Sequence, residues 1–322
     1  MSGLRHAVVT GAAGFIGSNL VDRLLVDGWR VTGYDNLSTG LAEFVAPARE
    51  HGAFELVEGD LLDRATLERA VAGADIVFHL AANADVRRGT EHPERDLEQN
   101  TIGTFNVLEA MRKGGVKRIA FSSTGSIYGE HQVVPTPEDA PFPVQTSLYG
   151  ASKLAGEGLI QAYCEGFGMS AVIFRFVSVL GERYTHGHVF DFCRQLFVDP
   201  TRLPVLGNGK QRKSYMYVGD CVSAVLLAAE TSAGKVGIFN LGIDGSIQVT
   251  QSIGWIAREL GITPELHFAG GERGWIGDSP LIQLDTSRIT RLGWVPQVSI
   301  EDGVRRTVRW LSANRWVFDR RD

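Results

Sequence analysis

Tyr149 and Lys153 lie four residues apart in the stretch Tyr-Gly-Ala-Ser-Lys. Residues with this spacing share one face of a helix, so the lysine ammonium would lie near the phenol. A nearby positive charge favours the phenolate and lowers the pKa of a tyrosine from its ordinary value of about 10. We therefore expect Tyr149 to exchange protons near neutral pH. Many helices carry this pair by chance, so the rest of the chain must support the hypothesis.

The composition is that of a globular protein without a broad basic surface. Of the 322 residues, 44% are hydrophobic, and the formal net charge at pH 7 is −5. This balance argues against a nucleic-acid partner, although it allows a local basic pocket. No uncharged run reaches the length of a membrane span, and the first apolar residues are too few for a secretory leader. We expect no nucleic acid and no membrane among the partners.

Cysteine usage indicates a reducing compartment. Cys164, Cys193 and Cys221 lie far apart, and none forms a Cys-x-x-Cys pair. A disulfide framework or a metal site is therefore not expected. Buried thiols in a cytoplasmic protein are the expectation.

A glycine-rich turn separates the first expected strand from the first expected helix. Ala7–Thr10 is a short apolar run, and Ile16 and Leu20 begin a helical pattern. Between them the sequence follows G-x-x-G-x-x-G. Glycines allow close approach of a ligand, and a helix N-terminus attracts a phosphate. The candidate dinucleotide ligands are Gly11, Gly14, Phe15, Ile16 and Gly17.

Acidic residues follow the next two expected strands. The strand Arg30–Asp35 ends 18 residues beyond Gly17, near the distance at which a carboxylate meets the adenosine ribose. A carboxylate accepts hydrogen bonds from ribose hydroxyls and repels a 2′-phosphate, which favours NAD over NADP. Asn36 would assist Asp35. After the strand Phe54–Asp60, we expect Asp60 and Leu61 to bracket the adenine.

Small residues end the fourth expected strand, Asp75–Ala82, where Leu80, Ala81 and Ala82 would let a cofactor lie flat. His79 is interpreted as a packed core residue. Asn100, on an expected helix Glu94–Gly114, is a further candidate cofactor ligand.

The strands Arg118–Ser123 and Ser170–Phe176 complete a regular alternation of strand and helix. Such an alternation is typical of an α/β fold with a doubly wound parallel sheet, the Rossmann arrangement, with ligands at the carboxyl ends of the strands. The order becomes irregular after Phe176. We expect an NAD-binding domain at 1–176, with a return segment near 214–242, and a smaller mixed α/β substrate domain at 177–322.

Together, these motifs resemble the extended short-chain dehydrogenase/reductase family. The resemblance covers nearly the whole chain and is greatest to NAD-dependent nucleotide-sugar epimerases of the UDP-glucose 4-epimerase type. It implies NAD as cofactor, a UDP-sugar substrate, and a homodimer formed by the helices around 94–114 and 149–167. It rests on Gly11–Gly17, Asp35–Asn36, Gly59–Leu61, His79–Ala82, Asn100, Ser122–Gly129, Tyr149–Lys153 and Arg175–Arg183.

The resemblance also implies a reaction and three catalytic residues. Tyr149 would be general base and acid, Lys153 would hold the nicotinamide ribose, and Thr124 would bond to the sugar O4. C4 of the sugar would be oxidised by NAD to a ketone, and hydride would return to its other face. The product is inverted at C4 without net redox change.

Residues 125 and 126 separate epimerases from similar enzymes. Nucleotide-sugar 4,6-dehydratases carry an Asp–Glu pair directly after the Thr, and the related decarboxylases usually keep the Glu. Here these positions are Gly125 and Ser126, which cannot transfer protons usefully. We therefore favour 4-epimerisation, and a dehydratase, decarboxylase or reductase is the alternative.

The second half departs from the family pattern where the substrate would lie. Ser178 stands where the family has Asn, and Lys213 stands where it usually has Arg. The sugar therefore stays open between a neutral hexose, an N-acetylhexosamine and a hexuronate. The candidate substrate-binding residues are Ser126, Ser178, His188, Val189, Val205, Lys213 and Arg273.

Overall fold

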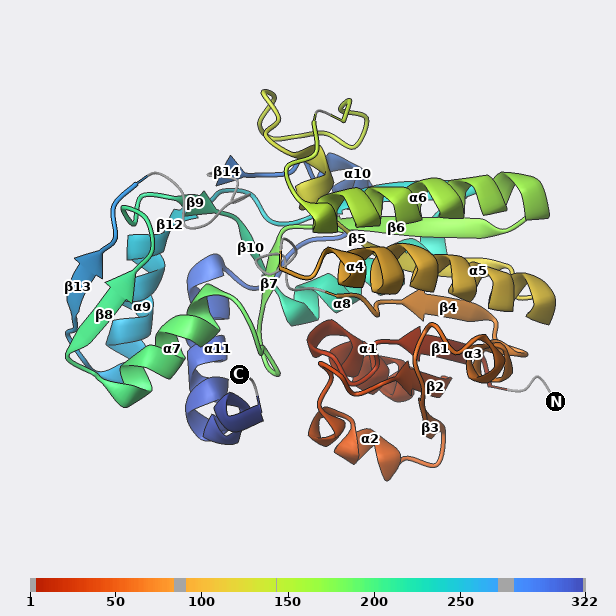
Figure 1. Cartoon of the computed structure of the whole chain (residues 1–322), viewed down its shortest axis with the longest axis horizontal. Helices are drawn as coiled ribbons and strands as arrows, with labels where there is room; N and C mark the ends of the chain where they lie inside the picture. The colour runs from red at the N-terminus through yellow and green to blue at the C-terminus, as the bar shows by residue number, and fades with distance from the viewer. Residues whose placement is uncertain (1–3, 84–90, 143, 272–280, 321–322) are drawn as a thin grey trace.

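A seven-stranded parallel sheet dominates the computed structural model, which describes residues 4–83, 91–142, 144–271 and 281–320 (Figure 1). Its strand order is β11-β6-β5-β4-β1-β2-β3. The reversal of order beside β1 confirms the doubly wound arrangement expected from the sequence. The strands are β1 (His6–Thr10), β2 (Arg30–Asp35), β3 (Phe54–Glu58), β4 (Ile76–His79), β5 (Arg118–Thr124), β6 (Ser170–Phe176) and β11 (Val236–Leu241).

Helices cover both faces of this sheet. Val8 and Val77 belong to one apolar cluster, while Val9 and Phe78 belong to another, because successive side chains of a strand point to opposite faces. Strands covered on both faces are apolar along their length, which explains the run Ala7–Val9. The helices on one face are α1 (Phe15–Val26) and α8 (Val218–Thr231), and those on the other are α3 (Arg64–Val71), α5 (Gly103–Gly114) and α6 (Leu148–Phe167).

Within the described residues, short strands of the second half form three small sheets with strand orders β10-β7, β12-β9-β14 and β13-β8. The chain returns to the main sheet through α8 and β11, which pairs in parallel with β6. The strands are β7 (Ser178–Leu180), β8 (Arg202–Val205), β9 (Arg212–Lys213), β10 (Tyr215–Tyr217), β12 (Ile247–Gln248), β13 (Glu265–Phe268) and β14 (Leu281–Ile282). The helices are α7 (His188–Val198), α9 (Val249–Leu260), α10 (Ser287–Arg291) and α11 (Ile300–Ala313).

Short helical elements complete the described chain. They are η1 (Ala42–Phe44), α2 (Ala46–Arg49), α4 (Pro93–Arg95), η3 (Gly125–Tyr128) and η4 (Arg315–Arg320). None of the helices in the described ranges combines the length and the apolar character that a membrane crossing requires.

Two strands end earlier than the sequence predicts, for the same reason. β4 ends at His79 because its neighbour β1 ends at the paired residue Thr10, where Gly11 turns the chain away. β3 likewise ends at Glu58, which pairs with the last residue of β2, Asp35. Each of these strands ends where its neighbour ends. The apolar residues of a single strand do not show where that neighbour ends.

The single helix expected over 94–114 is interrupted. A π-helical segment, η2 (Asp96–Ile102), precedes α5, and it buries the side chains of Asp96 and Asn100. Gly103 follows, where a Cβ atom would lie 2.8 Å from the Leu61 side chain. A π-turn is frequent at functional sites, and this one lies beside α6, the helix that carries Tyr149.

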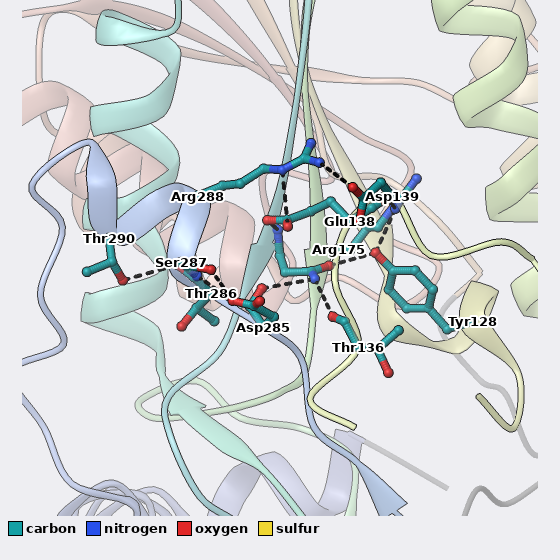
Figure 2. A network of polar contacts seen from close by, with 11 residues as sticks. Tyr128, Thr136, Glu138, Asp139, Arg175, Asp285, Thr286, Ser287, Arg288 and Thr290 are labelled. Atoms are coloured by element: carbon teal, nitrogen blue, oxygen red, sulfur yellow. Dashed lines mark hydrogen bonds and ion pairs between the residues drawn. The ribbon is translucent and has the colours of Figure 1, made fainter. Parts of the chain in front are cut away.

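A buried ion pair joins α6 to the sheet. Arg175 of β6 makes two hydrogen bonds to Glu157 of α6, at 3.0 and 2.7 Å, and Ser123 of β5 donates to the same carboxylate. Tyr128 accepts a bond from Arg175 at 2.6 Å (Figure 2). Because Arg175 and Glu157 are buried, each charge depends on the other for compensation.

Replacing Arg175 with Met should lower the free energy of unfolding by about 3–5 kcal/mol, since Glu157 would be left charged and buried. Urea unfolding followed by circular dichroism measures the change. Lys235→Met is the control, because Lys235 and its partner Glu165 are exposed and such pairs contribute little. Equal losses in the two variants would contradict the role assigned to the buried pair.

Candidate active site

The glycine-rich turn brings backbone against backbone at the carboxyl end of β1. A Cβ atom at Gly11 would lie 2.7 Å from the Ala81 nitrogen, and one at Gly17 would lie 2.0 Å from the Gly11 oxygen. Gly11 also has φ +71°, a region that favours glycine. Gly14 is the N-cap of α1 and provides no side-chain cap. Phe15, Ile16 and Gly17 therefore begin the helix with amides that have no intrahelical carbonyl partner, a geometry that fits a phosphate.

Asp35 ends β2 beside this turn. Its two carboxylate oxygens accept bonds from the Ala13 and Leu37 amides at 2.9 and 2.8 Å. Burial raises the pKa of Asp35, and the two amide bonds oppose that rise. Each oxygen retains a second lone pair, so the geometry is compatible with the predicted bonds to ribose hydroxyls.

Asn36 and Asp60 contact each other across the ends of β2 and β3. The Asn36 amide donates to Asp60 at 2.7 Å, and the Leu62 amide donates to the other Asp60 oxygen at 2.9 Å. Leu61 is buried and packs towards Gly103. The contact of Asp60 and Leu61 with adenine stays a prediction.

The segment after β4 lies against Thr10. The Leu80 amide donates to the Thr10 carbonyl at 3.2 Å, and the Ala81 amide donates to the Thr10 hydroxyl at 3.3 Å. The side chains of Leu80, Ala81 and Ala82 are half-buried at this edge. His79 is fully buried between Thr10 and Thr104, as the sequence interpretation has it, and burial lowers its pKa to about 3.

Asn100 connects the π-turn to α6. Its side-chain NH₂ lies within hydrogen-bonding distance of Ser152 Oγ (2.9 Å), Asp96 Oδ1 (3.2 Å) and the Asn83 carbonyl (3.2 Å). Its carbonyl oxygen accepts from the Asn83 amide at 2.8 Å. Ser152 in turn donates to the backbone oxygen of Tyr149 at 2.8 Å. The geometry thus gives Asn100 a bridging position, and its predicted contact with the cofactor stays a prediction.

Lys153 is buried under the end of β5. Its ammonium donates to the Ser122 carbonyl at 2.8 Å and lies 4.8 Å from the Phe121 ring centroid. Burial lowers the pKa of Lys153 to about 7, while the negative charges of Asp96 and Glu157 oppose the fall. A change of protonation at this lysine therefore falls in the neutral range.

The pKa of Tyr149 contradicts the expectation that this phenol exchanges protons near neutral pH. Its pKa is raised to about 12, because removal of water from the phenol and the charge of Asp96 both disfavour the phenolate. A hydrogen bond with the Thr124 hydroxyl lowers the pKa but does not reverse the rise. The removal of water from the phenol therefore outweighs the helical spacing on which the expectation rested.

Thr124 ends β5 and caps the turn η3. Its hydroxyl accepts from the Ser126 amide at 3.1 Å and lies 3.2 Å from the Ser126 hydroxyl. Thr124, Ser126 and Tyr149 thus form one polar group at the carboxyl edge, next to the ends of β4 and β1 in the sheet.

Two of the substrate candidates have side chains in the core. Val189 and Val205 are fully buried, so a substrate contact through either side chain is not available in this structure. His188 begins α7, where its ring bonds to Ser252 at 2.7 Å and packs 4.6 Å from Tyr215. Burial, with the charge of Lys213, lowers the pKa of His188 to about 3. His188 is therefore a neutral hydrogen-bonding partner of Ser252 in this structure.

The remaining substrate candidates lie on short strands. Ser178 is exposed at the start of β7, and Lys213 is half-buried in β9. Arg273 lies outside the described residues. Among the described side chains, no group of three or more His, Cys, Asp or Glu could hold a metal ion.

Sequence reasoning missed Asp96 and Glu157, whose charges act on Lys153. A helical signal was available for both. Glu157 lies four residues after Lys153, and Asp96 lies four residues before Asn100, so each shares a helix face with a predicted site residue.

Comparisons with known proteins agree with this geometry. A family model described as the NAD dependent epimerase/dehydratase family matches residues 7–242. A UDP-glucose 4-epimerase of Mycolicibacterium smegmatis is 35% identical over 314 residues, covering 95% of this chain and 98% of the relative.

Two solved structures share the fold along nearly the whole chain. A crystal structure of a UDP-galactose 4-epimerase is 36% identical, with a TM-score of 0.87 over 97% of this chain and 100% of that one. A UDP-glucuronic acid 4-epimerase from Bacillus cereus, in complex with UDP-glucuronic acid and NAD, is 26% identical, with a TM-score of 0.88 over 96% and 99% of the two chains.

Gly17→Ala should reduce the dinucleotide retained by the purified protein more than about tenfold, since even a ~1.4 kcal/mol loss of binding has that effect. The added methyl would collide with the Gly11 carbonyl. Nucleotide released by acid and measured by chromatography gives the result. Gly254→Ala is the matched control, because that helical site has open space. Equal retention in both variants would contradict the fit of the turn to a phosphate.

Lys153→Met should make the nucleotide-free protein more stable than wild type at pH 6, by an amount that shrinks as pH rises. The pKa of Lys153 is about 7 when folded, against an ordinary value of 10.5. Between pH 7 and pH 10.5 the unfolded wild-type chain binds more protons than the folded protein. The stability of the wild type therefore rises with pH in this range, and the variant, which has no lysine at 153, lacks that rise. Urea unfolding at pH 6, 8 and 10 measures the difference. A difference independent of pH would contradict the burial of a charged Lys153.

Proposed function

The chain belongs to the NAD-dependent epimerase/dehydratase family, and from that premise we propose that it inverts C4 of a UDP-sugar. The observation that carries the proposal is the space beside Thr124. A Cβ atom at Gly125 would lie 3.1 Å from the Phe176 carbonyl and 3.4 Å from both Ile282 and Leu284. A side chain at this position would press on the Phe176 carbonyl, which would have to move by a few tenths of an ångström. Gly125 has no side chain that could transfer the proton that elimination of water requires.

Tyr149 and Thr124 at the carboxyl edge, together with the buried Lys153, would handle the proton of the C4 hydroxyl. Tyr149 takes the proton of the C4 hydroxyl and later returns it, with Thr124 holding the same oxygen. The raised pKa of Tyr149 keeps the phenol protonated in the protein alone. Protonated Lys153, and any further positive charge bound beside the phenol, oppose that rise.

The residues around the glycine-rich turn fit a dinucleotide, and NAD bound there would accept hydride from C4 and return it. Gly11 to Gly17 would hold the diphosphate, and Asp35 with Asn36 the adenosine ribose. Asp60, Leu61 and Leu80 to Ala82 would line the base and the nicotinamide. Lys153 would hold the nicotinamide ribose, and Asn100 would position that end through Ser152.

The substrate would lie between this edge and the small sheets. We assign the phosphates to Lys213 and Arg273, and the sugar to Ser126, Ser178 and the loop before α7. Backbone groups of Val189 and Val205 remain available where their side chains do not. We also propose that 1–176 with the return segment near 214–242 binds the cofactor, and 177–322 mainly the nucleotide sugar.

A homodimer in the cytoplasm completes the proposal. The helices around 94–114 and 149–167 would pair across the interface, and exposed apolar side chains at Leu97 and Phe167 support this. The three cysteines are free and buried, which supports a reducing compartment.

Incubation with UDP-glucose, UDP-N-acetylglucosamine and UDP-glucuronate, followed by chromatography and mass spectrometry, tests the proposal. We expect one of them to give a product of unchanged mass that is inverted at C4. Tyr149→Phe should lower kcat about 10²–10⁴-fold, the usual contribution of a positioned acid or base. A product lighter by water or carbon dioxide, or full activity of Tyr149→Phe, would refute it.

A further inference from the structure

Two apolar side chains close the space next to the proposed catalytic threonine. Ile282, in β14, and Leu284 both lie 3.4 Å from the position of a Cβ atom built on Gly125, at van der Waals contact. Gly125 directly follows Thr124, so this pair, called here the apolar wall, packs against the residue next to the proposed catalytic threonine.

The backbone of the wall is held by the loop that follows η3. The Thr136 amide donates to the Gln283 carbonyl, and the Asp285 amide donates to the Thr136 carbonyl, both at 2.9 Å. Asn240 of β11 adds bonds to the carbonyls of Thr136 and Asp285, at 2.8 and 3.1 Å. The wall thus depends on where the Thr136 loop sits.

An ion pair anchors this loop to the segment that carries the wall (Figure 2). Arg288 Nε lies 3.3 Å from a carboxylate oxygen of Glu138, and its Nη2 lies 3.7 Å from Asp139. The Glu138 side chain is 2% exposed, and its other oxygen accepts from the Asn240 amide at 3.0 Å. Arg175 donates to the Glu138 carbonyl at 2.8 Å, which connects the loop to the buried pair with Glu157.

The wall strand also contacts the proposed phosphate site. β14 pairs in parallel with β9, where Ile282 is the register partner of Lys213. One short strand therefore lies between the residue proposed to bind phosphate and the turn proposed to bind the sugar oxygen.

We propose that Glu138 and Arg288 form a latch that holds the apolar wall against the Thr124 turn and keeps water from the oxidised sugar. The inference rests on the proposed function. A ketone at C4 makes the C–H bonds of C3 and C5 acidic. If solvent base reaches them, a C–H bond breaks, the proton passes to solvent, and the electron pair forms an enolate. A solvent proton then re-forms the C–H bond, with no redox change.

Turnover in D₂O tests the latch, with deuterium at C3 and C5 measured per molecule of C4-inverted product by mass spectrometry and NMR. The holoenzyme is incubated with UDP-glucose, UDP-N-acetylglucosamine and UDP-glucuronate in turn. Wild-type product should carry no deuterium at C3 or C5. Product of Arg288→Met and of Glu138→Gln should carry measurable deuterium at C3 or C5, and Arg288→Lys should restore part of the protection.

Arg258→Met is the matched control, since Arg258 is exposed and its ion pair with Glu301, at 3.7 Å, includes no residue of the wall or of the Thr136 loop. A partly unfolded preparation lowers the amount of product but not the deuterium in each molecule of it. Equal deuterium per product in wild type, Arg288→Met and Glu138→Gln would overturn the latch. Absence of any C4-inverted product from the wild-type enzyme would instead overturn the proposed function, and the latch with it.

Discussion

The buried pair between Arg175 and Glu157 is the interaction on which the arrangement of the candidate site depends. It joins β6 to α6 and, through Ser123, to the end of β5. Tyr149 and Lys153 lie on that helix, and Thr124 follows Ser123. A shift of α6 along the sheet would therefore separate the phenol from the threonine hydroxyl.

The burial of the side chains of α6 also sets the pKa values of Lys153 and Tyr149. Lys153 has exchanged water for one carbonyl, so its pKa falls to about 7 although the charges of Asp96 and Glu157 oppose the fall. The same removal of water raises the pKa of Tyr149 to about 12. The protein alone thus holds a neutral phenol beside an easily deprotonated lysine, and ligand charge is needed to shift this balance towards the phenolate.

Sequence reasoning predicted the elements that carry local signals. β2 and β6 have the bounds that the sequence predicts. It failed where an outcome depends on distant residues. The end of β4 is set by Thr10 in a neighbouring strand, and the sign of the Tyr149 shift is set by burial. Glu138, Asn240 and Arg288 meet across more than a hundred residues, without a shared periodicity. The predicted substrate contacts of Val189 and Val205 stay predictions, and the burial of both side chains leaves only their backbone groups for that role.

Retention of a label at C4 tests the central claim, that the hydrogen removed from C4 as hydride returns to the same carbon within a closed site. The substrate is a UDP-sugar deuterated at C4, and the product is examined by NMR after inversion in ordinary water. The account predicts an inverted product that keeps deuterium at C4. Inverted product with hydrogen from solvent at C4 would contradict it, because inversion would then proceed through loss of a proton and not through reversible transfer of hydride.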